Sequence, residues 1–160
     1  MEQKLYQEMV KKYADTVYRI AINYTKSGFD ADDVVQNVFL KLYTQDKLAQ
    51  DGEHLKRWLI RVSINECKNL LAAFWRKNVV SIEEENYEPV FSTPEKSDLY
   101  NAVMDLPIKY RIVIHLYYYE GYSSKEIASL LNIREQAVRT RLVRGRNMLK
   151  QQLKEVWQDE

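Results

Sequence analysis

The sequence predicts an all-α fold made of two small helical domains joined by a flexible acidic linker. Apolar residues recur at three- and four-residue steps through most of the chain, as they do in amphipathic helices. The 160 residues include 4 Gly and 3 Pro, too few turn signals for a many-stranded sheet. Residues 78–97 interrupt the helical period and hold two of the three prolines. We therefore expect domains at 1–77 and 98–160, with 78–97 as the linker.

Three helices are expected in the first domain. The first covers about residues 1–25 and ends at Gly28, and Asp30 suits the N-cap of a second helix that reaches Tyr43. A polar loop should follow, before a third helix over about 53–77. The expected buried positions of that third helix are Leu55, Trp58, Leu59, Val62, Leu70, Leu71 and Phe74.

The second domain should contain four helices. A short one over 98–104 stops at Leu106-Pro107, and a longer one over 108–120 is closed by Gly121. Ser123 and Glu126 have the spacing of a capping box that opens the next helix. A tight turn at 132–133 then leads to a basic helix over about 135–156.

Charge is unevenly distributed, although the net charge is only +1. Residues 51–78 carry six basic and three acidic side chains, whereas residues 79–98 carry one and six. Residues 134–150 hold six Lys or Arg against a single acid, Glu135. Such a cluster on one helix is typical of a protein that binds a phosphate backbone, the alternative being an ordinary solvated helix face.

A short helix, a turn and a longer basic helix form the pattern of a helix-turn-helix. At about 100° per residue, Val138, Leu142, Gly145 and Leu149 share one face of the basic helix, and polar and Arg side chains share the other. This split lets the helix pack on one side and present base-reading groups to a major groove on the other. It predicts DNA binding without saying which process the protein serves.

The third helix of the first domain mixes aromatic, cationic and amide side chains. Aromatic rings stack on bases, cations meet phosphates and amides read base edges, which is the set that single-stranded nucleic acid requires. Two alternatives stay open. Trp58 and Phe74 are better explained as core residues, and Arg61, Asn65, Lys68 and Asn69 fit a solvated face equally well.

The sequence indicates no enzyme and no cofactor. No carboxylate pair lies in a frame that suggests acid/base work, and we find no glycine-rich phosphate loop and no nucleophile with a histidine partner. The single cysteine, Cys67, excludes an intramolecular disulfide. The densest acidic cluster, Glu83-Glu84-Glu85, falls in the expected linker, so a metal-dependent nuclease ranks last. The single cysteine indicates a reducing, cytoplasmic compartment. No apolar stretch reaches the roughly 18 residues of a spanning helix, so no direct membrane insertion is expected.

Three blocks of the sequence resemble the bacterial RNA polymerase sigma factors of the extracytoplasmic-function (ECF) group. They are DADDVVQNVFLKLY at 30–43, HLKRWLIRVSINECKNLL at 54–71 and LPIKYRIVIHLYYYEGYSSKEIASLLNIREQAVRTRLVRGRNMLKQQL at 106–153. The resemblance covers nearly the whole chain, in the family's order. It implies a transcription initiation factor whose first domain docks on the polymerase clamp and melts the minus-ten element, and whose second domain binds the minus-thirty-five element.

The resemblance assigns residues to each role by position. The polymerase-binding positions are Asp33, Gln36 and Asn37, the last of which departs from the acid more usual there. The loop at 46–56 corresponds to the element that captures a flipped base, and the minus-ten positions are Trp58, Arg61, Asn65, Lys68 and Asn69. The minus-thirty-five positions are Arg134, Gln136, Arg139, Thr140, Val143 and Arg144. Arg134 replaces the usual capping Ser or Pro, and could contact a phosphate instead.

The implied partners are core RNA polymerase, promoter DNA and an anti-sigma factor, with no small-molecule substrate. A different class remains as the alternative: a helix-turn-helix transcriptional regulator whose first domain senses a ligand or dimerises. A sensor needs a pocket and a dimer needs a symmetric apolar seam. The basic, aromatic-bearing third helix favours the initiation factor.

Overall fold

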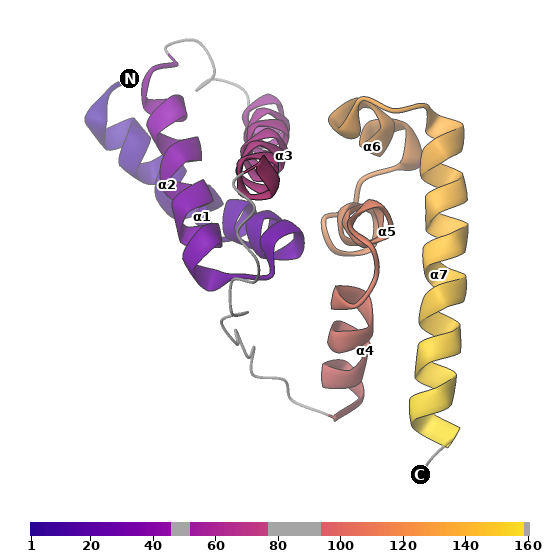
Figure 1. Cartoon of the computed structure of the whole chain (residues 1–160). Coiled ribbons are helices and arrows are strands. Elements are labelled where there is room, and N and C mark those ends of the chain that lie inside the picture. The colour runs from indigo at the N-terminus through magenta and orange to yellow at the C-terminus, as the bar shows by residue number, and fades with distance from the viewer. Residues whose placement is uncertain (46–51, 77–93, 159–160) are drawn as a thin grey trace. The chain divides into compact units, whose positions relative to one another are not determined.

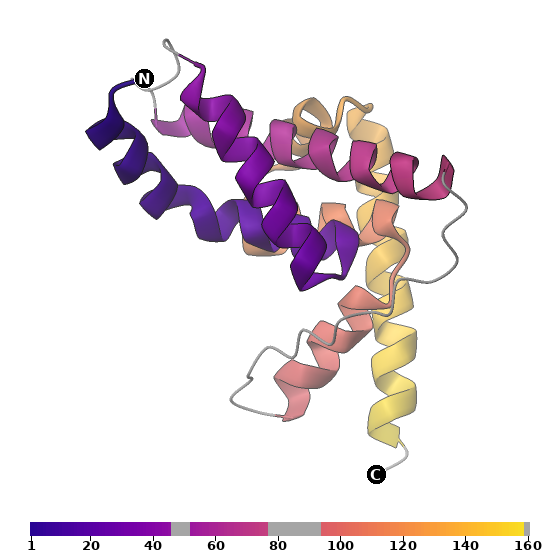
Figure 2. The same ribbon diagram turned by 60° about the vertical axis from the view of Figure 1, so that its left-hand side comes forward.

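The computed structural model describes residues 1–45, 52–76 and 94–158, and these residues form helices with no strand among them. The predicted all-α class is confirmed. The chain divides into two compact units, Met1–Tyr87 and Glu88–Glu160. Each unit is described by itself below, and Figures 1 and 2 show the helices from two directions.

The first unit is a bundle of three helices, α1 (Gln3–Thr25), α2 (Gly28–Tyr43) and α3 (Gly52–Arg76). Each helix contacts the other two, as the two views of the ribbon make visible (Figures 1 and 2). Aliphatic side chains from all three helices meet in the interior, where Ile20, Leu42, Leu59 and Ile60 are fully buried. The amphipathic periods of the sequence therefore converge on one core.

The junction between α1 and α2 differs from the predicted one. Gly28 does not end the first helix: Lys26 takes the left-handed conformation there, with φ at 55°, and Gly28 is already in α2. The N-cap is Ser27 and not Asp30, because the Ser27 hydroxyl accepts a hydrogen bond from the Asp30 backbone N–H at 3.2 Å. Asp30 lies in the first turn, where its negative charge interacts favourably with the positive end of the helix dipole.

The buried face of α3 differs from the predicted one. Leu55 and Leu59 are buried as expected, but the other five predicted core positions, Trp58, Val62, Leu70, Leu71 and Phe74, are only half-buried. Ile60, Ser63, Ile64 and Cys67 are buried instead. The helix lies against both α1 and α2, which places two adjacent stripes in the interior. The buried Ser63 hydroxyl donates a hydrogen bond to the Leu59 carbonyl at 2.6 Å, so this polar group has a partner inside the bundle.

The second unit consists of α4 (Pro94–Met104), α5 (Ile108–Ile114), the π-helical turn η2 (His115–Tyr119), α6 (Ser124–Leu131) and α7 (Glu135–Gln158). The long helix α7 contacts α4, α5 and α6 (Figure 1). The buried core of the unit includes Leu106, Ile112, Leu116, Ile127 and Val138. One helix thus provides the surface on which the other three assemble.

The start of the second unit also differs from prediction. The expected linker runs to residue 97, but α4 begins at Pro94, so residues 94–97 are helical. Proline is well suited to the first helical position, since its missing N–H would have no partner there in any case. The rest of the expected linker, residues 78–93, and its boundary with the first domain lie outside the described residues.

The expected helix over 108–120 is two elements in the structure. A regular α-helix ends at Ile114, and the next turn is π-helical, with the Glu120 N–H donating to the His115 carbonyl at 3.1 Å. Gly121 closes the segment with φ at 78°, a conformation that favours glycine. His115 Nε2 and Glu120 Oε1, 3.3 Å apart, link the two ends of the turn.

The two predicted turns around α6 are confirmed. The Ser123 hydroxyl accepts from the Glu126 N–H at 3.2 Å while the Glu126 carboxylate accepts from the Ser123 N–H at 3.1 Å, which is a complete capping box. Asn132 ends the helix in the left-handed conformation, with φ at 54°. The capping box therefore sets where α6, the first helix of the helix-turn-helix, begins, and Asn132 sets where it ends.

Candidate nucleic-acid and polymerase interfaces

The first interface is the outer face of α7. Val138, Leu142 and Gly145 are buried, and Leu149 is half-buried, so the inward face follows the predicted split. Of the predicted DNA-reading residues, five are exposed and Thr140 is half-buried; the five are Arg134, Gln136, Arg139, Val143 and Arg144. The polar and cationic side chains therefore lie together on the accessible side of one helix.

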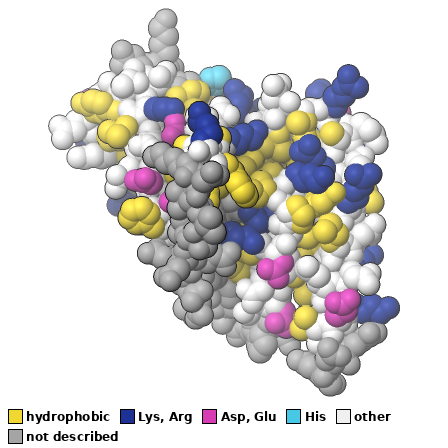
Figure 3. All heavy atoms as spheres, viewed as in Figure 1, with side chains coloured by type: hydrophobic (Ala, Val, Ile, Leu, Met, Phe, Trp, Pro, Cys, Tyr) yellow, Lys and Arg dark blue, Asp and Glu magenta, His cyan; other side chains and the backbone are white. Residues whose placement is uncertain are grey.

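The basic character of this face is visible on the molecular surface. Figure 3 shows Lys and Arg side chains gathered along α7 and around the turn that precedes it. Arg139 pairs with Glu135 one turn earlier, with 2.5 Å between Nη2 and Oε1. Exposed pairs of this kind are worth little, about 0.3–0.5 kcal/mol, so a stronger anion could displace the carboxylate.

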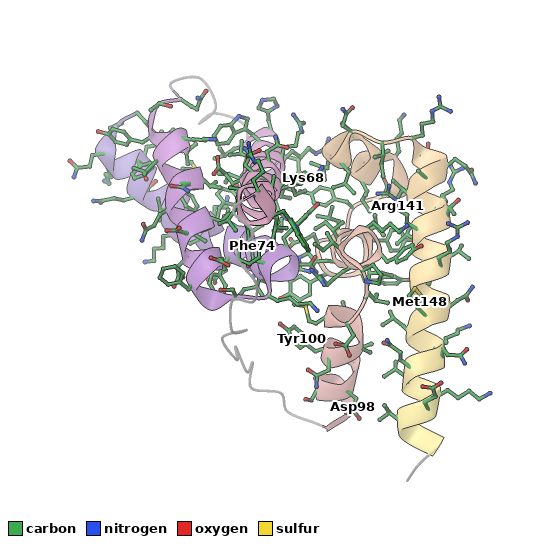
Figure 4. All side chains as sticks on the ribbon, viewed as in Figure 1. Lys68, Phe74, Asp98, Tyr100, Arg141 and Met148 are labelled. Carbon is green, nitrogen blue, oxygen red and sulfur yellow. The ribbon has the colours of Figure 1, made fainter. Side chains whose placement is uncertain are left out.

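The second interface is the outer face of α3. Arg61, Asn65, Lys68 and Asn69 are all exposed, at spacings that place them on one side of the helix. Figure 4 labels Lys68 on this helix. Glu66, the neighbouring acid, points elsewhere and forms an ion pair with Lys41 of α2. This face is consequently cationic and rich in amides.

The aromatic residues of α3 divide between core and surface. Trp58 is half-buried, next to the exposed Arg61 along the helix, and Phe74 is also half-buried. Trp75, by contrast, is 77% exposed. The core interpretation of Trp58 and Phe74 is therefore only half right, and Trp75 is an accessible ring that the sequence reasoning did not single out as a site.

The third interface is a stripe along α2. Asp33, Gln36 and Asn37 are exposed, and Gln36 and Asn37 lie three and four residues after Asp33, on the same side of the helix. The same stripe carries three exposed apolar side chains, Phe29 at 69%, Leu40 at 64% and Tyr43 at 50%. The sequence pattern assigns no role to any of these three side chains. Several exposed apolar side chains on one side of a helix, rimmed by polar ones, are typical of a protein-binding surface.

The loop predicted to capture a flipped base, 46–56, is divided. Residues 46–51 lie outside the described residues, and residues 52–56 form the first turn of α3. Tyr13 of α1 contacts this turn, because its hydroxyl donates to the Gly52 carbonyl at 3.2 Å. The start of α3 is thereby held against α1.

Metal-binding and cysteine chemistry find little support. Within the described residues no cluster of three or more His, Cys, Asp or Glu side chains could hold a metal ion. Cys67 is buried, and burial, with a smaller contribution from the Glu66 charge, raises the pKa of its thiol to about 12. The thiol is therefore protonated and unreactive at neutral pH.

None of the helices in the described part of the chain is long and apolar enough to cross a membrane.

Comparison with known proteins matches both units. The Sigma-70 region 2 family model matches residues 9–77, and the Sigma-70, region 4 model matches residues 96–149. The ECF RNA polymerase sigma-E factor of Escherichia coli (strain K12) is 30% identical over 165 residues, covering 92% of this chain and 86% of the relative. A region 2 match over α1–α3 argues against a ligand-sensing first domain.

Solved structures agree on the fold. The sigma factor RpoE in complex with the anti-sigma factor NepR from Bartonella quintana superimposes with a TM-score of 0.80 at 23% identity, covering 93% of this chain and 96% of that one. CnrH in complex with the cytosolic domain of CnrY gives a TM-score of 0.65 at 22% identity, covering 96% and 90%. The helical architecture, the two family-model matches and the curated relative lead to one conclusion: this chain belongs to the ECF RNA polymerase sigma factors, and it is a transcription initiation factor that directs RNA polymerase.

Proposed function

We propose that the two units divide promoter recognition between them, the first gripping the polymerase and the melted minus-ten strand and the second reading the minus-thirty-five duplex. The domains would be 1–77 and 98–160, with the structure's earlier start of α4 moving the second boundary to about residue 94. The observation that carries this proposal is the presence of a cationic, amide-bearing face on α3 and a separate cationic face on α7.

The α2 stripe is proposed as the polymerase contact. Gln36 and Asn37 offer amides, Asp33 offers a charge, and Phe29 and Leu40 provide apolar area on the same side of the helix. Protein interfaces combine such an apolar centre with a polar rim. Asn37 removes one negative charge from the stripe relative to the family's usual acid, which should weaken the dependence of this contact on salt.

The α3 face is proposed to hold the displaced single strand. Extruding a base costs a few kcal/mol of lost stacking, and stacking on an aromatic ring returns about 1–3 kcal/mol per base. Trp58 and the exposed Trp75 are the available rings, with Arg61 and Lys68 for phosphates and Asn65 and Asn69 for base edges. The α7 residues would read the duplex, with Arg144 and Arg139 as the strongest donors to guanine.

We also propose that the protein works in the cytoplasm, does no chemistry itself and is held inactive by an anti-sigma factor. Support for the last point comes from one structural neighbour, the sigma factor RpoE, whose structure is that of a complex with the anti-sigma factor NepR. Both the α2 stripe and the α7 face are accessible in the free chain, so a partner covering either would block initiation.

Two substitutions test the division of roles. Gln36→Ala should lower affinity for core polymerase in a pull-down or fluorescence titration while leaving duplex binding by the free chain unchanged. Arg144→Ala should do the reverse: a loss of about 1–3 kcal/mol of base readout lowers duplex affinity by about 5- to 150-fold, and run-off transcription should fall with it. If Arg144→Ala lowers core binding instead, the assignment of faces is wrong, and an unchanged core affinity for Gln36→Ala rejects the α2 contact.

A further inference from the structure

A pocket open to solvent lies where the start of α5 meets the start of α7. It has a volume of about 410 Å³ and is lined by residues from α5, from the turn before α7 and from α7 itself. The lining residues are Lys109, Tyr110, Arg134, Gln136, Ala137, Thr140, Arg141 and Arg144. Lys109 and Tyr110 belong to neither helix of the helix-turn-helix, and neither they nor Arg141 is among the predicted reading residues.

The charge around the pocket is of one sign. Lys109, Arg134, Arg141 and Arg144 are cations, and no carboxylate is among the described residues that line it. Four like charges around one concave surface repel each other and raise the local concentration of anions. The Tyr110 phenol adds a further hydrogen-bonding group: burial raises its pKa, but hydrogen bonds and charge from Arg144 and Lys109 outweigh this and leave the pKa below its usual value.

The wall that bears Lys109 and Tyr110 is held in place from two sides. Gly145 of α7 is buried against α5, and a Cβ built there would lie 3.3 Å from the Ile114 side chain and 3.5 Å from the Cβ of Tyr110, so even alanine would require Ile114 to shift by a few tenths of an ångström. On the other side the buried Arg111 donates hydrogen bonds to the carbonyls of Met104 at 3.1 Å and Leu106 at 3.0 Å. The backbone of α5 at the pocket is thus fixed before any ligand arrives.

The pocket is continuous with the outer face of α7. It shares Arg134, Gln136, Thr140 and Arg144 with the proposed reading residues, and Figure 4 labels Arg141 on the side of α7 that faces the rest of the unit. A duplex whose major groove receives α7 must carry one of its sugar-phosphate backbones past the edge of that helix. The pocket lies at such an edge, where α5 meets α7.

We infer that this pocket is a binding site for one phosphate of the DNA backbone, in which Lys109 and Tyr110 of α5 act together with Arg141, next to the base-reading Arg144. The inference rests on the proposed duplex binding by the second unit and deepens it. Its role is to set the position of α7 in the groove: phosphate contacts fix register and orientation while base contacts supply sequence discrimination. Lys109 would therefore contribute affinity without contributing specificity.

The experiment measures binding of the full chain to two labelled duplexes of about 20 base pairs, one from upstream of a mapped start site and one with the same bases shuffled. Fluorescence anisotropy over a series of salt concentrations gives the affinity and its salt dependence. Lys109→Gln should lower affinity for both duplexes by the same factor, and the slope of log K against log salt should become shallower by about 0.9. At 0.1 M salt that slope corresponds to a loss of about eightfold.

Lys154→Gln is the matched control, since it removes the same charge from an exposed position of the same unit, outside the pocket. It should change affinity by less than about twofold and leave the slope unaltered. Tyr110→Phe, which keeps the ring and removes only the hydroxyl, should give a smaller loss that is again equal on the two duplexes. If Lys109→Gln behaves like Lys154→Gln while Arg144→Ala still weakens binding, the phosphate site is wrong and the proposed function stands.

Two further outcomes are distinct from that one. Failure of the wild-type chain to bind either duplex, alone or with core polymerase, would overturn the proposed function itself and the site with it. Competition with inorganic phosphate distinguishes a site for a DNA phosphate from a site for the free anion. At matched ionic strength, inorganic phosphate should displace the duplex no better than chloride does. Displacement that is specific to phosphate and disappears in Lys109→Gln would instead assign the pocket to the free anion.

Discussion

Arg111 offers the sharpest test of how the second unit is held together. It is 3% exposed, and its guanidinium donates to the carbonyl of Met104, the last residue of α4, and to that of Leu106 just beyond the helix. Hydrogen bonds from a charged donor contribute about 1.5–3 kcal/mol each. Arg111→Met, which keeps the length and removes the donors, should therefore cost about 3–6 kcal/mol. Relief of the desolvation penalty of the buried charge places the expected net loss at the lower end, about 3 kcal/mol.

Native-state hydrogen exchange is the appropriate assay, because it reports on each unit separately. A loss of about 3 kcal/mol corresponds to a fall in protection on the order of 100-fold for the core amides of α5, α6 and α7. Amides of α1, α2 and α3 should keep their protection. Arg139→Met is the control: its guanidinium is exposed and pairs only one turn away, so the loss should be about 0.5 kcal/mol or less. Equal effects of the two substitutions, or less than a tenfold change for Arg111→Met, would refute the reasoning.

Two other positions give simple expectations. Burial raises the pKa of the Cys67 thiol to about 12, so this thiol should resist alkylation by iodoacetamide at pH 8 in the folded chain and react readily in urea. Modification of the folded chain at the rate of a free thiol would contradict the burial of Cys67. Gly121 has φ at 78°, so Gly121→Ala should lower the free energy of unfolding by about 1 kcal/mol, and Gly121→Asn by clearly less, because Asn tolerates the left-handed region. Thermal unfolding measures both variants, and an Ala variant more stable than the Asn variant would count against backbone strain as the cause.

Much of the second unit could be predicted from its sequence because its signals are local. The Ser123–Glu126 capping box requires only two residues at fixed spacing, and the inward face of α7 follows from Val138 and Leu142 alone. Both features are set by chemistry within one or two helical turns. Local rules of this kind hold in the structure even though the partner helices are distant in sequence.

The errors came from positions where two local signals competed. Gly28 is a good helix terminator, but Ser27 followed three residues later by Asp30 is a good helix start, and the start signal prevailed because it satisfies a backbone N–H. Lys26 then has to adopt the left-handed conformation that glycine would have taken more cheaply. The spacing was visible in the sequence and could have identified the cap.

Other features depend on tertiary contacts that no local pattern contains. Arg111 counts as one more basic residue in the sequence, yet it is a buried structural side chain whose partners lie in the preceding turn. Likewise, Phe29 and Leu40 look like core residues of an amphipathic helix and are exposed, since α2 uses its other face to contact α1 and α3. Lys109 and Tyr110 could not be connected with the basic helix until the close approach at Gly145 was known.

The π-helical turn at His115–Tyr119 has a consequence for which changes in chain length the second unit can tolerate. A π turn accommodates one residue more than an α turn would, so it behaves as a one-residue insertion absorbed within a helix. Deleting a residue from this turn could restore regular α geometry without shortening the path to Gly121. A deletion within α5 would instead rotate the preceding residues by about 100°, carrying Arg111 out of the interior. Natural or engineered length variation in this stretch should therefore be tolerated at the tyrosines and rejected a few positions earlier.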